Sequence, residues 1–161
     1  MRILAYIYYL ITSLRNFLYD KRILPIRRVE GVEIICIGNI TVGGTGKTPA
    51  VQYFVKRLQK MGRKVAVVSR GYRGKRKREP LLVSDGYEIF ATARESGDEP
   101  FIHALNLKVP IVVSSNRYKG CMFAKKHFGV DTIVLDDGFQ HRKLYRDRDI
   151  VLIDATNPFG W

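Results

Sequence analysis

A glycine-rich segment is the clearest source of chemistry in the chain. Residues 41–49 read TVGGTGKTP. Glycines let successive backbone N–H groups approach a phosphate, and a helix that begins there adds its partial positive charge. Lys47 can then reach the β- and γ-phosphates of a nucleotide, while the Thr48 hydroxyl can ligate Mg²⁺. The pattern G-x-x-x-x-G-K-[ST] is broken only at its first position, Thr41. The predicted phosphate loop consists of Thr41, Val42, Gly43, Gly44, Thr45, Gly46, Lys47 and Thr48.

Two adjacent carboxylates supply the second element that such a loop needs. Residues 132–141 read TIVLDDGFQH, so Asp136 and Asp137 directly follow an apolar run. In open α/β folds, ligands bind at the carboxyl ends of the strands, where these side chains are predicted to lie. A lone aspartate after a strand commonly forms a turn, but the phosphate loop favours Mg²⁺ binding by at least one of the pair. The candidate metal ligands are therefore Thr48, Asp136 and Asp137.

A second acidic pair stands in residues 96–100, SGDEP, before a predicted helix. Asp98 can be interpreted as the cap of that helix, a common use of aspartate. It can also be interpreted as a general base that accepts the proton of a hydroxyl group attacking a γ-phosphate. The sequence alone leaves both interpretations open.

Other catalytic and metal-binding patterns are absent from the sequence. It contains no G-x-S-x-G elbow, no H-E-x-x-H pair and no Rossmann G-x-G-x-x-G. Cys36 and Cys121 stand far apart and form neither a disulfide framework nor a metal-ligand set, which favours a reducing compartment. His103 and His127 are interpreted as ordinary helix residues, and His141 gains interest only from its closeness to Asp137.

The elements around the loop must position these groups. Residues 32–39, VEIICIGN, predict a buried strand that leads into the loop. Apolar residues at helical spacing predict a helix over 48–61, ending before Gly62, and a second strand over 64–69. Strand, loop, helix and strand together form a βαβ unit, whose crossover is almost always right-handed.

The rest of the chain continues this alternation. The strand runs are nearly continuous in apolar residues, so the sheet is expected to be covered on both faces, as in a mainly parallel α/β sheet of the P-loop NTPase type flanked by helices. The further predicted elements are a basic loop at 70–80, a hairpin at 81–90 around Asp85-Gly86, a polar loop at 92–97, helices near 99–107 and 116–128, and strands at 108–114, 131–137 and 149–154.

The N-terminus is apolar but short. Residues 3–11, ILAYIYYLI, fall well below the roughly 20 apolar residues of a membrane span, and no small-residue cleavage site follows them. An amphipathic helix over 1–24 that lies on an anionic membrane face is the favoured interpretation, and a helix packed on the domain is the alternative. The predicted organisation is this helix followed by a P-loop kinase-type core domain over 25–161.

Charge points to an anionic partner. The chain has 161 residues, 46% of them hydrophobic, so it can build a core, and its formal net charge is +13. Basic residues gather after the apolar N-terminus and again at 73–78. Either cluster alone can be a solvated surface, but the two together favour binding to nucleic acid, a phospholipid surface or a phosphorylated substrate.

Several segments, taken in order, resemble the tetraacyldisaccharide 4'-kinase family, the lipid A kinases of Gram-negative bacteria. They are GNITVGGTGKTP, SRGYRG, SGDEP, NRYKG, LDDGFQHRKLYRD and DATNPFG. The phosphate loop is common to many NTPases, whereas DDGFQH combined with GDEP and NPFG is far more specific. In that family the first glycine of the loop is usually missing, which accounts for Thr41. The family's chains are about twice as long, so the resemblance covers their N-terminal half and implies that the C-terminal half is absent here.

The resemblance implies an ATP- and Mg²⁺-dependent enzyme. It would transfer the γ-phosphate of ATP to the 4'-hydroxyl of a tetraacylated glucosamine disaccharide 1-phosphate, as a peripheral protein on the cytoplasmic face of the bacterial inner membrane. A P-loop ATPase or switch protein that acts on nucleic acid or another anionic partner is the alternative. Tyr72 is the only aromatic residue beside the basic cluster at 73–78, which speaks against nucleic acid.

The family motifs also imply roles for individual residues. Lys47, Asp98 and Asp137 would be catalytic, with Asp98 the base, and Asp136 and Asp137 would order metal and phosphate. Arg117 is a candidate contact for the 1-phosphate of the sugar. The residues implied around the acceptor are Arg70, Tyr72, Arg117, Gln140 and His141.

Overall fold

A mixed six-stranded sheet forms the centre of the protein. The computed structural model describes residues 2–39 and 46–155, and side chains from Tyr6 onward. The strands have the order β3-β4-β2-β5-β1-β6, and every neighbouring pair is parallel except β3 with β4. This confirms the mainly parallel α/β sheet. The strands are β1 (Glu33–Asn39), β2 (Val65–Ser69), β3 (Leu81–Ser84), β4 (Ile111–Val113), β5 (Thr132–Asp136) and β6 (Arg148–Leu152).

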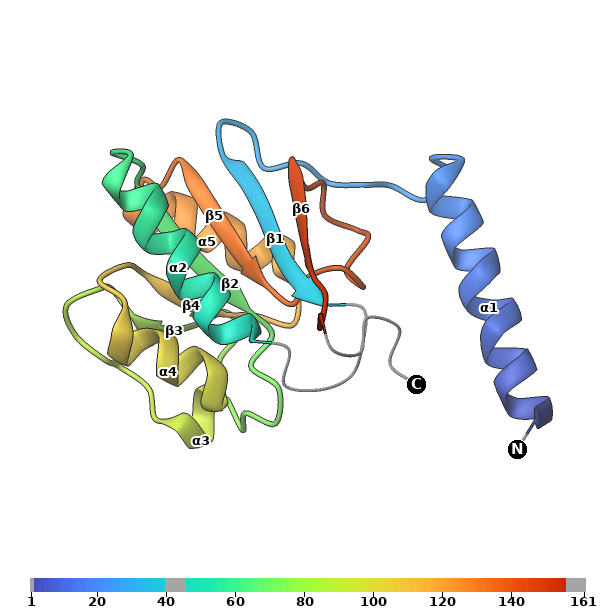
Figure 1. The fold of residues 1–161 in the computed structure, drawn as a ribbon, viewed down its shortest axis with the longest axis horizontal. Coiled ribbons are helices and arrows are strands. Elements are labelled where there is room, and N and C mark those ends of the chain that lie inside the picture. The colour runs from blue at the N-terminus through green and yellow to red at the C-terminus, as the bar shows by residue number, and fades with distance from the viewer. Residues whose placement is uncertain (1, 40–45, 156–161) are drawn as a thin grey trace.

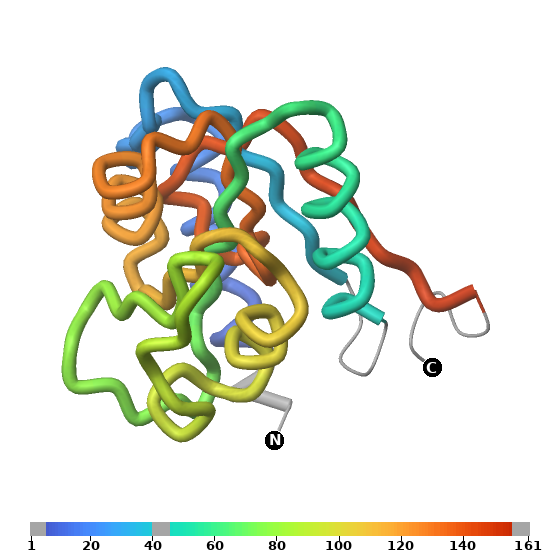
Figure 2. The backbone as a smooth tube through the Cα atoms, turned by 90° about the vertical axis from the view of Figure 1, so that its left-hand side faces the viewer, coloured from blue at the N-terminus to red at the C-terminus, as the bar shows by residue number. Residues whose placement is uncertain are grey.

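Helices cover both faces of the sheet. Figure 2 shows α2 and α5 on opposite sides of it, and Figure 1 shows α4 near the lower end of α2. The strands β1, β2 and β5 are mostly apolar and buried because both of their faces are covered, as the sequence predicted. The edge strand β6 differs, since it begins with the exposed residues Arg148 and Asp149. The helices are α1 (Arg2–Asp20), α2 (Lys47–Lys60), α3 (Ala93–Ser96), α4 (Asp98–Asn106) and α5 (Arg117–Phe128).

Alternation along β1 divides the core into two halves. Cys36 is fully buried on one side with Cys121 of α5, and Ile37 on the other with Val51 and Val55 of α2. Successive side chains of a strand point to opposite faces, so neighbouring residues of β1 serve different cores. The sheet is therefore anchored from both sides, and its carboxyl edge is held in place.

Local signals set the helix ends. Asn116 accepts a hydrogen bond from the Lys119 amide at the start of α5, and Gly129, with φ of 58°, ends that helix. The C-cap of α2 is Met61, and Gly62 follows in the left-handed region. These ends match the predicted helices to within one residue.

The middle of the chain departs from the prediction at two places. The turn at Asp85-Gly86 forms, because the Asp85 carboxylate accepts the amides of Tyr87 and Glu88. Its second arm contributes a single bridge, and β3 pairs with β4 instead. The predicted polar loop at 92–97 was wrong: α3 forms there because Thr92 and Glu95 make a reciprocal capping box.

Helix α1 stands beside the domain, as Figure 1 shows, and touches it mainly at its C-terminal end. Tyr19 is buried there, and Arg142 donates to Asp20 Oδ1 at 2.5 Å. Most of the helix is not packed along the domain in this structure, since eight apolar side chains are at least 46% exposed. They are Tyr6, Ile7, Tyr8, Tyr9, Leu10, Ile11, Leu14 and Phe17. Over the residues described, no helix combines the length and apolarity that a membrane crossing requires.

Glycines bring the start of the basic loop against the turn between α3 and α4. Gly97 has φ of 90° and ψ of 159°, a region that is essentially restricted to glycine. A Cβ atom there would lie 2.7 Å from the Tyr72 carbonyl oxygen, and one at Gly74 would lie 2.5 Å from the Glu95 carbonyl oxygen. These two backbones can therefore approach closely only because the side chains are missing.

Substitution of Gly97 tests this contact. We expect Gly97→Ala to lower the free energy of unfolding by about 3 kcal/mol or more, because backbone strain and steric overlap add. Gly62→Ala is the control: Gly62 also has a positive φ but has nothing within 4 Å of an added Cβ, so only the left-handed cost of about 1–2 kcal/mol is expected. Urea unfolding measures both, and equal losses would contradict the packing argument.

Candidate functional site

The carboxyl edge of the sheet brings together residues that are far apart in the sequence. Lys47 begins α2, beyond the end of β1, and Asp137 follows β5. The two strands are neighbours, with Ile37 paired to Asp136. Lys47 Nζ consequently lies 3.4 Å from Asp137 Oδ2. The sequence predicted Lys47 in the phosphate loop and Asp137 at the carboxyl edge of the sheet, without pairing the two.

Asp137 has an unusual backbone for a residue with a side chain. Its φ is 56°, in the left-handed region, and its amide donates to the Ile37 carbonyl at 2.9 Å. The chain thus turns immediately after β5 and leaves the Asp137 side chain about half exposed, at 53%. Asp136, one residue earlier, is buried in the sheet at 1% exposure. The two adjacent carboxylates therefore meet different surroundings.

A cavity at this edge collects the acidic groups. We call it the carboxylate cavity, and it lies where the strands β2 and β5 and the helices α2 and α4 end or begin. Its lining residues are Lys47, Ser69, Arg70, Tyr72, Glu99, Asp136, Asp137 and Gln140.

Glu99, rather than its neighbour Asp98, lines the carboxylate cavity. Burial raises the pKa of Glu99, and the nearby charges of Asp136 and Asp137 raise it further, against the opposing effect of Lys47. Asp98 is exposed in the first turn of α4, and Gly97 occupies the N-cap position. The interpretation of Asp98 as the helix cap was therefore wrong. Sequence reasoning placed Glu99 beside Asp98 but could not tell which of the two faces inward.

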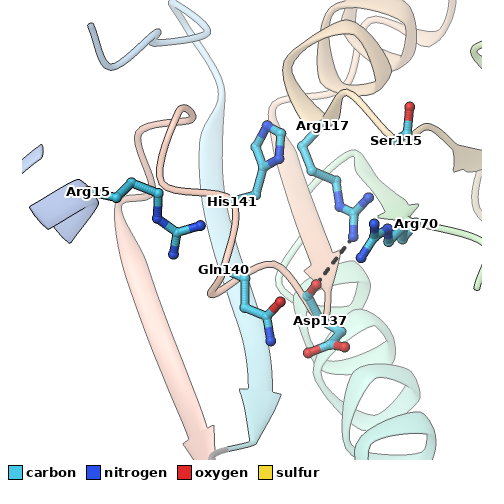
Figure 3. A pocket seen from close by; sticks show the side chains of 7 residues that line it. All are labelled: Arg15, Arg70, Ser115, Arg117, Asp137, Gln140 and His141. Atoms are coloured by element: carbon cyan, nitrogen blue, oxygen red, sulfur yellow. Dashed lines mark hydrogen bonds between the residues drawn. The ribbon is translucent and has the colours of Figure 1, made fainter. Parts of the chain in front are cut away.

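A second cavity adjoins the first and is dominated by cations. We call it the arginine cavity; Arg70, Asp137 and Gln140 line both. Figure 3 shows Arg15 of α1 reaching toward Gln140 and His141, on the side opposite Arg70 and Arg117. Its lining residues are Arg15, Arg70, Ser115, Arg117, Asp137, Gln140 and His141.

Arg117 is the buried member of this cavity. Its Nη1 donates to the Ser114 carbonyl at 2.7 Å and its Nη2 to the Asp137 carbonyl at 3.2 Å. Burial lowers the pKa of Arg117, and the charge of Arg70 lowers it further. The pKa of His141 is lowered by burial and then by Arg117. Arg70 and Arg117 repel one another, so an anion placed between them would be attracted.

The basic loop is fastened to this cavity through Glu79. Glu79 Oε1 accepts from the Ser114 hydroxyl at 2.7 Å and from the amide and hydroxyl of Ser115, which lines the arginine cavity. Arg76 Nε donates to Glu79 Oε2 at 2.6 Å. The loop after β2 and the loop after β4 are thereby joined beside Arg117.

The predicted residues are distributed as follows. Five of the phosphate-loop residues, at 41–45, lie outside the described part of the chain, while Gly46, Lys47 and Thr48 stand at the start of α2. The residues predicted around an acceptor all line one or both cavities. Asp98 lines neither. Sequence reasoning missed four cavity residues, namely Arg15, Ser69, Glu99 and Ser115.

The donor set suits Mg²⁺ held together with phosphates. Within residues 2–39 and 46–155, no three His, Cys, Asp or Glu side chains converge closely enough to hold a metal ion by themselves. Mg²⁺ usually retains several waters and takes one or two carboxylates plus substrate phosphates. Asp136 and Asp137, near Lys47, provide that kind of partial site.

Fold and site together define a class of protein. A parallel sheet with G-K-T at the start of the helix after its first strand, and with carboxylates after the adjacent strand, is typical of P-loop nucleotide-binding proteins. More narrowly, the chain belongs to the tetraacyldisaccharide-1-P 4'-kinase (LpxK) family, whose model matches residues 1–161. The resemblance seen in the motifs is thus confirmed.

Individual relatives agree with this assignment. The chain is 46% identical to a tetraacyldisaccharide 4'-kinase from Halothermothrix orenii and 42% identical to one from Geobacter sulfurreducens, over 99% and 97% of its own length. It spans 42% and 44% of those proteins. A crystal structure of LpxK from Aquifex aeolicus in complex with ATP matches with a TM-score of 0.84 at 42% identity, covering 94% of this chain and 47% of that one.

The Glu79 junction makes a prediction for acid stability. Burial raises the pKa of Glu79, but hydrogen bonds from Arg76, Ser114 and Ser115 lower it by more, from 4.5 to about 2. A carboxyl whose pKa is lower in the folded state stabilises the fold above its unfolded pKa, and that stability is lost as the pH falls toward the folded pKa. We expect Glu79→Gln to be less stable than the wild type near neutral pH, and the difference to shrink as the pH falls from about 4.5 toward 2.

Urea unfolding at a series of pH values measures this difference. Ser114→Ala removes one donor to Glu79, so the folded pKa of Glu79 should lie closer to its unfolded value. The pH range over which the stability contribution of Glu79 is lost should then become narrower but should not disappear. A difference between wild type and Glu79→Gln that stays constant from neutral pH to pH 3 would contradict the assignment.

Proposed function

We propose that this chain carries the nucleotide-binding and phosphoryl-transfer part of a kinase. It would transfer the γ-phosphate of ATP to the 4'-hydroxyl of a tetraacylated glucosamine disaccharide 1-phosphate, a precursor of lipid A. The observation that carries the proposal is the 3.4 Å approach of Lys47 to Asp137 at the edge of a cavity lined by further carboxylates. Membership of the LpxK family supports the acceptor. Nothing in the described residues favours a nucleic-acid function over this one.

The phosphate end of the nucleotide would lie at the start of α2. The backbone of residues 41–48 would surround the phosphates, and the Lys47 ammonium would neutralise charge on the β- and γ-phosphates. Thr48, Asp136 and Asp137 would hold Mg²⁺, which supplies charge neutralisation and orients the phosphates when bound. Lys47 is paired with Asp137 in the structure. A phosphate beside Lys47 would therefore share the ammonium group with the Asp137 carboxylate.

The acceptor would enter through the arginine cavity. The cations of Arg15 and Arg70 surround space that also reaches Asp137, and repulsion between these cations and Arg117 favours an anionic ligand such as the sugar phosphate. Two nitrogens of Arg117 already donate to carbonyls. Arg117 would therefore attract the acceptor phosphate by its charge rather than by two parallel hydrogen bonds. Tyr72 and Gln140 would border the acceptor from the carboxylate cavity.

Asp98 is proposed as the base that takes the proton from the attacking hydroxyl. It lies beside Glu99 at the start of α4, and successive residues of a helix point about 100° apart, so the two carboxylates serve different directions. Glu99 faces the carboxylate cavity, where the nucleotide would lie. Asp98 lines neither cavity, so this role rests on the family motif and requires the acceptor hydroxyl to reach the exposed first turn of α4.

Helix α1 would hold the enzyme on its substrate's membrane. Its exposed apolar side chains and the nearby cations Arg15, Lys21 and Arg22 are suited to the interface of an anionic bilayer. We place the protein on the cytoplasmic face of the bacterial inner membrane, bound peripherally through the helix of residues 1–24, with the kinase core over 25–161.

The assignment of the base can be tested by substitution. We expect Asp98→Asn to lower turnover about 10²- to 10⁴-fold while leaving ATP affinity unchanged, because it removes proton transfer and no phosphate contact. Lys47→Ala is the control and should weaken ATP binding as well as turnover. The assay measures transfer of labelled γ-phosphate to the acylated disaccharide 1-phosphate in mixed micelles with Mg²⁺, beside direct nucleotide titration.

Two outcomes would overturn parts of this proposal. A turnover loss in Glu99→Gln but not in Asp98→Asn would move the base to Glu99. ATP binding without any Lys47-dependent product would show that these residues do not carry out the transfer.

The role of α1 has a separate test. Phe17→Asp should lower sedimentation with phosphatidylglycerol vesicles several-fold, because it places a charge on the exposed apolar surface. Asn16→Asp makes the same change in charge at a half-buried residue whose carbonyl accepts from Arg142, and should have a smaller effect. Removal of residues 1–19 should have the largest effect, and unaltered binding after it would contradict the membrane role.

A further inference from the structure

A histidine that the sequence analysis set aside is buried against a candidate metal ligand. His103 of α4 is 0% exposed, and Asp136 at the end of β5 is 1% exposed. His103 Nε2 lies 3.3 Å from Asp136 Oδ2. Among the described contacts this is the one side-chain hydrogen bond of Asp136. Nε2 is the donor of this bond when Asp136 is ionised, because an ionised carboxylate can only accept.

The other ring nitrogen, Nδ1, indicates that packing alone does not explain a histidine at position 103. His103 Nδ1 is buried and finds no hydrogen-bond partner among the described residues. A buried polar atom without a partner costs stability, whereas an aliphatic side chain of similar size would fill the same space without that cost. The histidine is therefore better explained by what its Nε2 does for Asp136.

Helix α4 presents this group in register with Glu99. The two residues are one helical turn apart, so their side chains lie on the same face of α4. Glu99 lines the carboxylate cavity, as does Asp136, while His103 lies fully buried behind it. One face of one helix thus contributes both a cavity carboxylate and the support of a second carboxylate.

We propose that His103 is a positioning residue that fixes the Asp136 carboxylate for Mg²⁺ bound together with a nucleotide. By holding Oδ2, it leaves Oδ1 as the oxygen with which Asp136 meets a ligand. It also stops the carboxylate from rotating or turning toward Lys47. This inference rests on the proposed function, because it takes Asp136 as a metal ligand. Groups that orient metal ligands typically change metal affinity or activity about 10- to 100-fold when removed.

The test measures nucleotide binding rather than turnover. A fluorescent ATP analogue is titrated into the full chain with saturating Mg²⁺ and again with EDTA. The Kd with EDTA divided by the Kd with Mg²⁺ gives the factor by which the metal tightens binding. We expect His103→Leu to lower this ratio about tenfold. His103→Gln keeps an N–H donor and should restore most of it. Ala104→Gly is the matched control, because it weakens the same helix without touching Asp136.

The outcomes separate this inference from the proposed function. An unchanged ratio in His103→Leu, while Asp136→Asn lowers it, would overturn the positioning role alone. An unchanged ratio in Asp136→Asn would instead overturn the metal role of Asp136 in the proposed function. If His103→Leu and Ala104→Gly lowered the Kd ratio equally, or if His103→Gln did not restore it, the role of His103 would be structural only. Thermal unfolding of each variant confirms that it is folded.

Discussion

The parallel pairing of β1 with β5 is the constraint on which the site depends. Asp136 is the last residue of β5, and the other groups, Lys47 and Asp137, stand just beyond the carboxyl ends of the two strands. Because the strands run the same way and Ile37 pairs with Asp136, the start of α2 and the turn after β5 come together at one edge. The approach of Lys47 to Asp137 follows from that register. A shift of one residue would also exchange the faces of β5, so the two buried cores enforce the observed register.

A second layer of the structure fixes the loops around this edge. Gly97 allows the turn before α4 to lie against the Tyr72 backbone, and Glu79 joins the basic loop to Ser114 and Ser115. The first contact is steric and the second is electrostatic, but both act on the segment that carries Arg70. Loops that would otherwise be free to move are thereby tied to the strands β2 and β4. The positions of Arg70 and Tyr72 at the cavities are a consequence.

Charge is divided between two adjoining cavities. One is lined by Glu99, Asp136 and Asp137 with Lys47 as a cation, and the other by arginines and His141. Arg70, Asp137 and Gln140 belong to both. A metal with nucleotide phosphates suits the first, and an anionic acceptor suits the second. Transfer between two ligands needs such adjoining sites, because the reacting groups must meet while their charges are kept apart.

The sequence by itself determined the order of the elements, the mainly parallel sheet and the motifs that place this chain in its family. Apolar runs, glycines and caps are local signals, so β1, α2 and α5 could be predicted to within about one residue. Predictions failed at two places, one where a local capping signal was overlooked and one where a strand had to choose between two partners. The capping box of Thr92 and Glu95 formed a helix in an apparent loop, and β3 paired with β4 instead of extending its own hairpin.

Only the tertiary structure decided how the side chains are divided among their environments. In the folded protein, Glu99 rather than Asp98 points toward the carboxylate cavity. Arg15 of α1 lines the arginine cavity, and His103 is buried against Asp136. Each of these depends on the rotation of a helix about its axis or on a contact between distant segments. Residue types and spacing constrain such geometry weakly, because the energy that fixes it comes from packing against neighbours that are remote in the sequence.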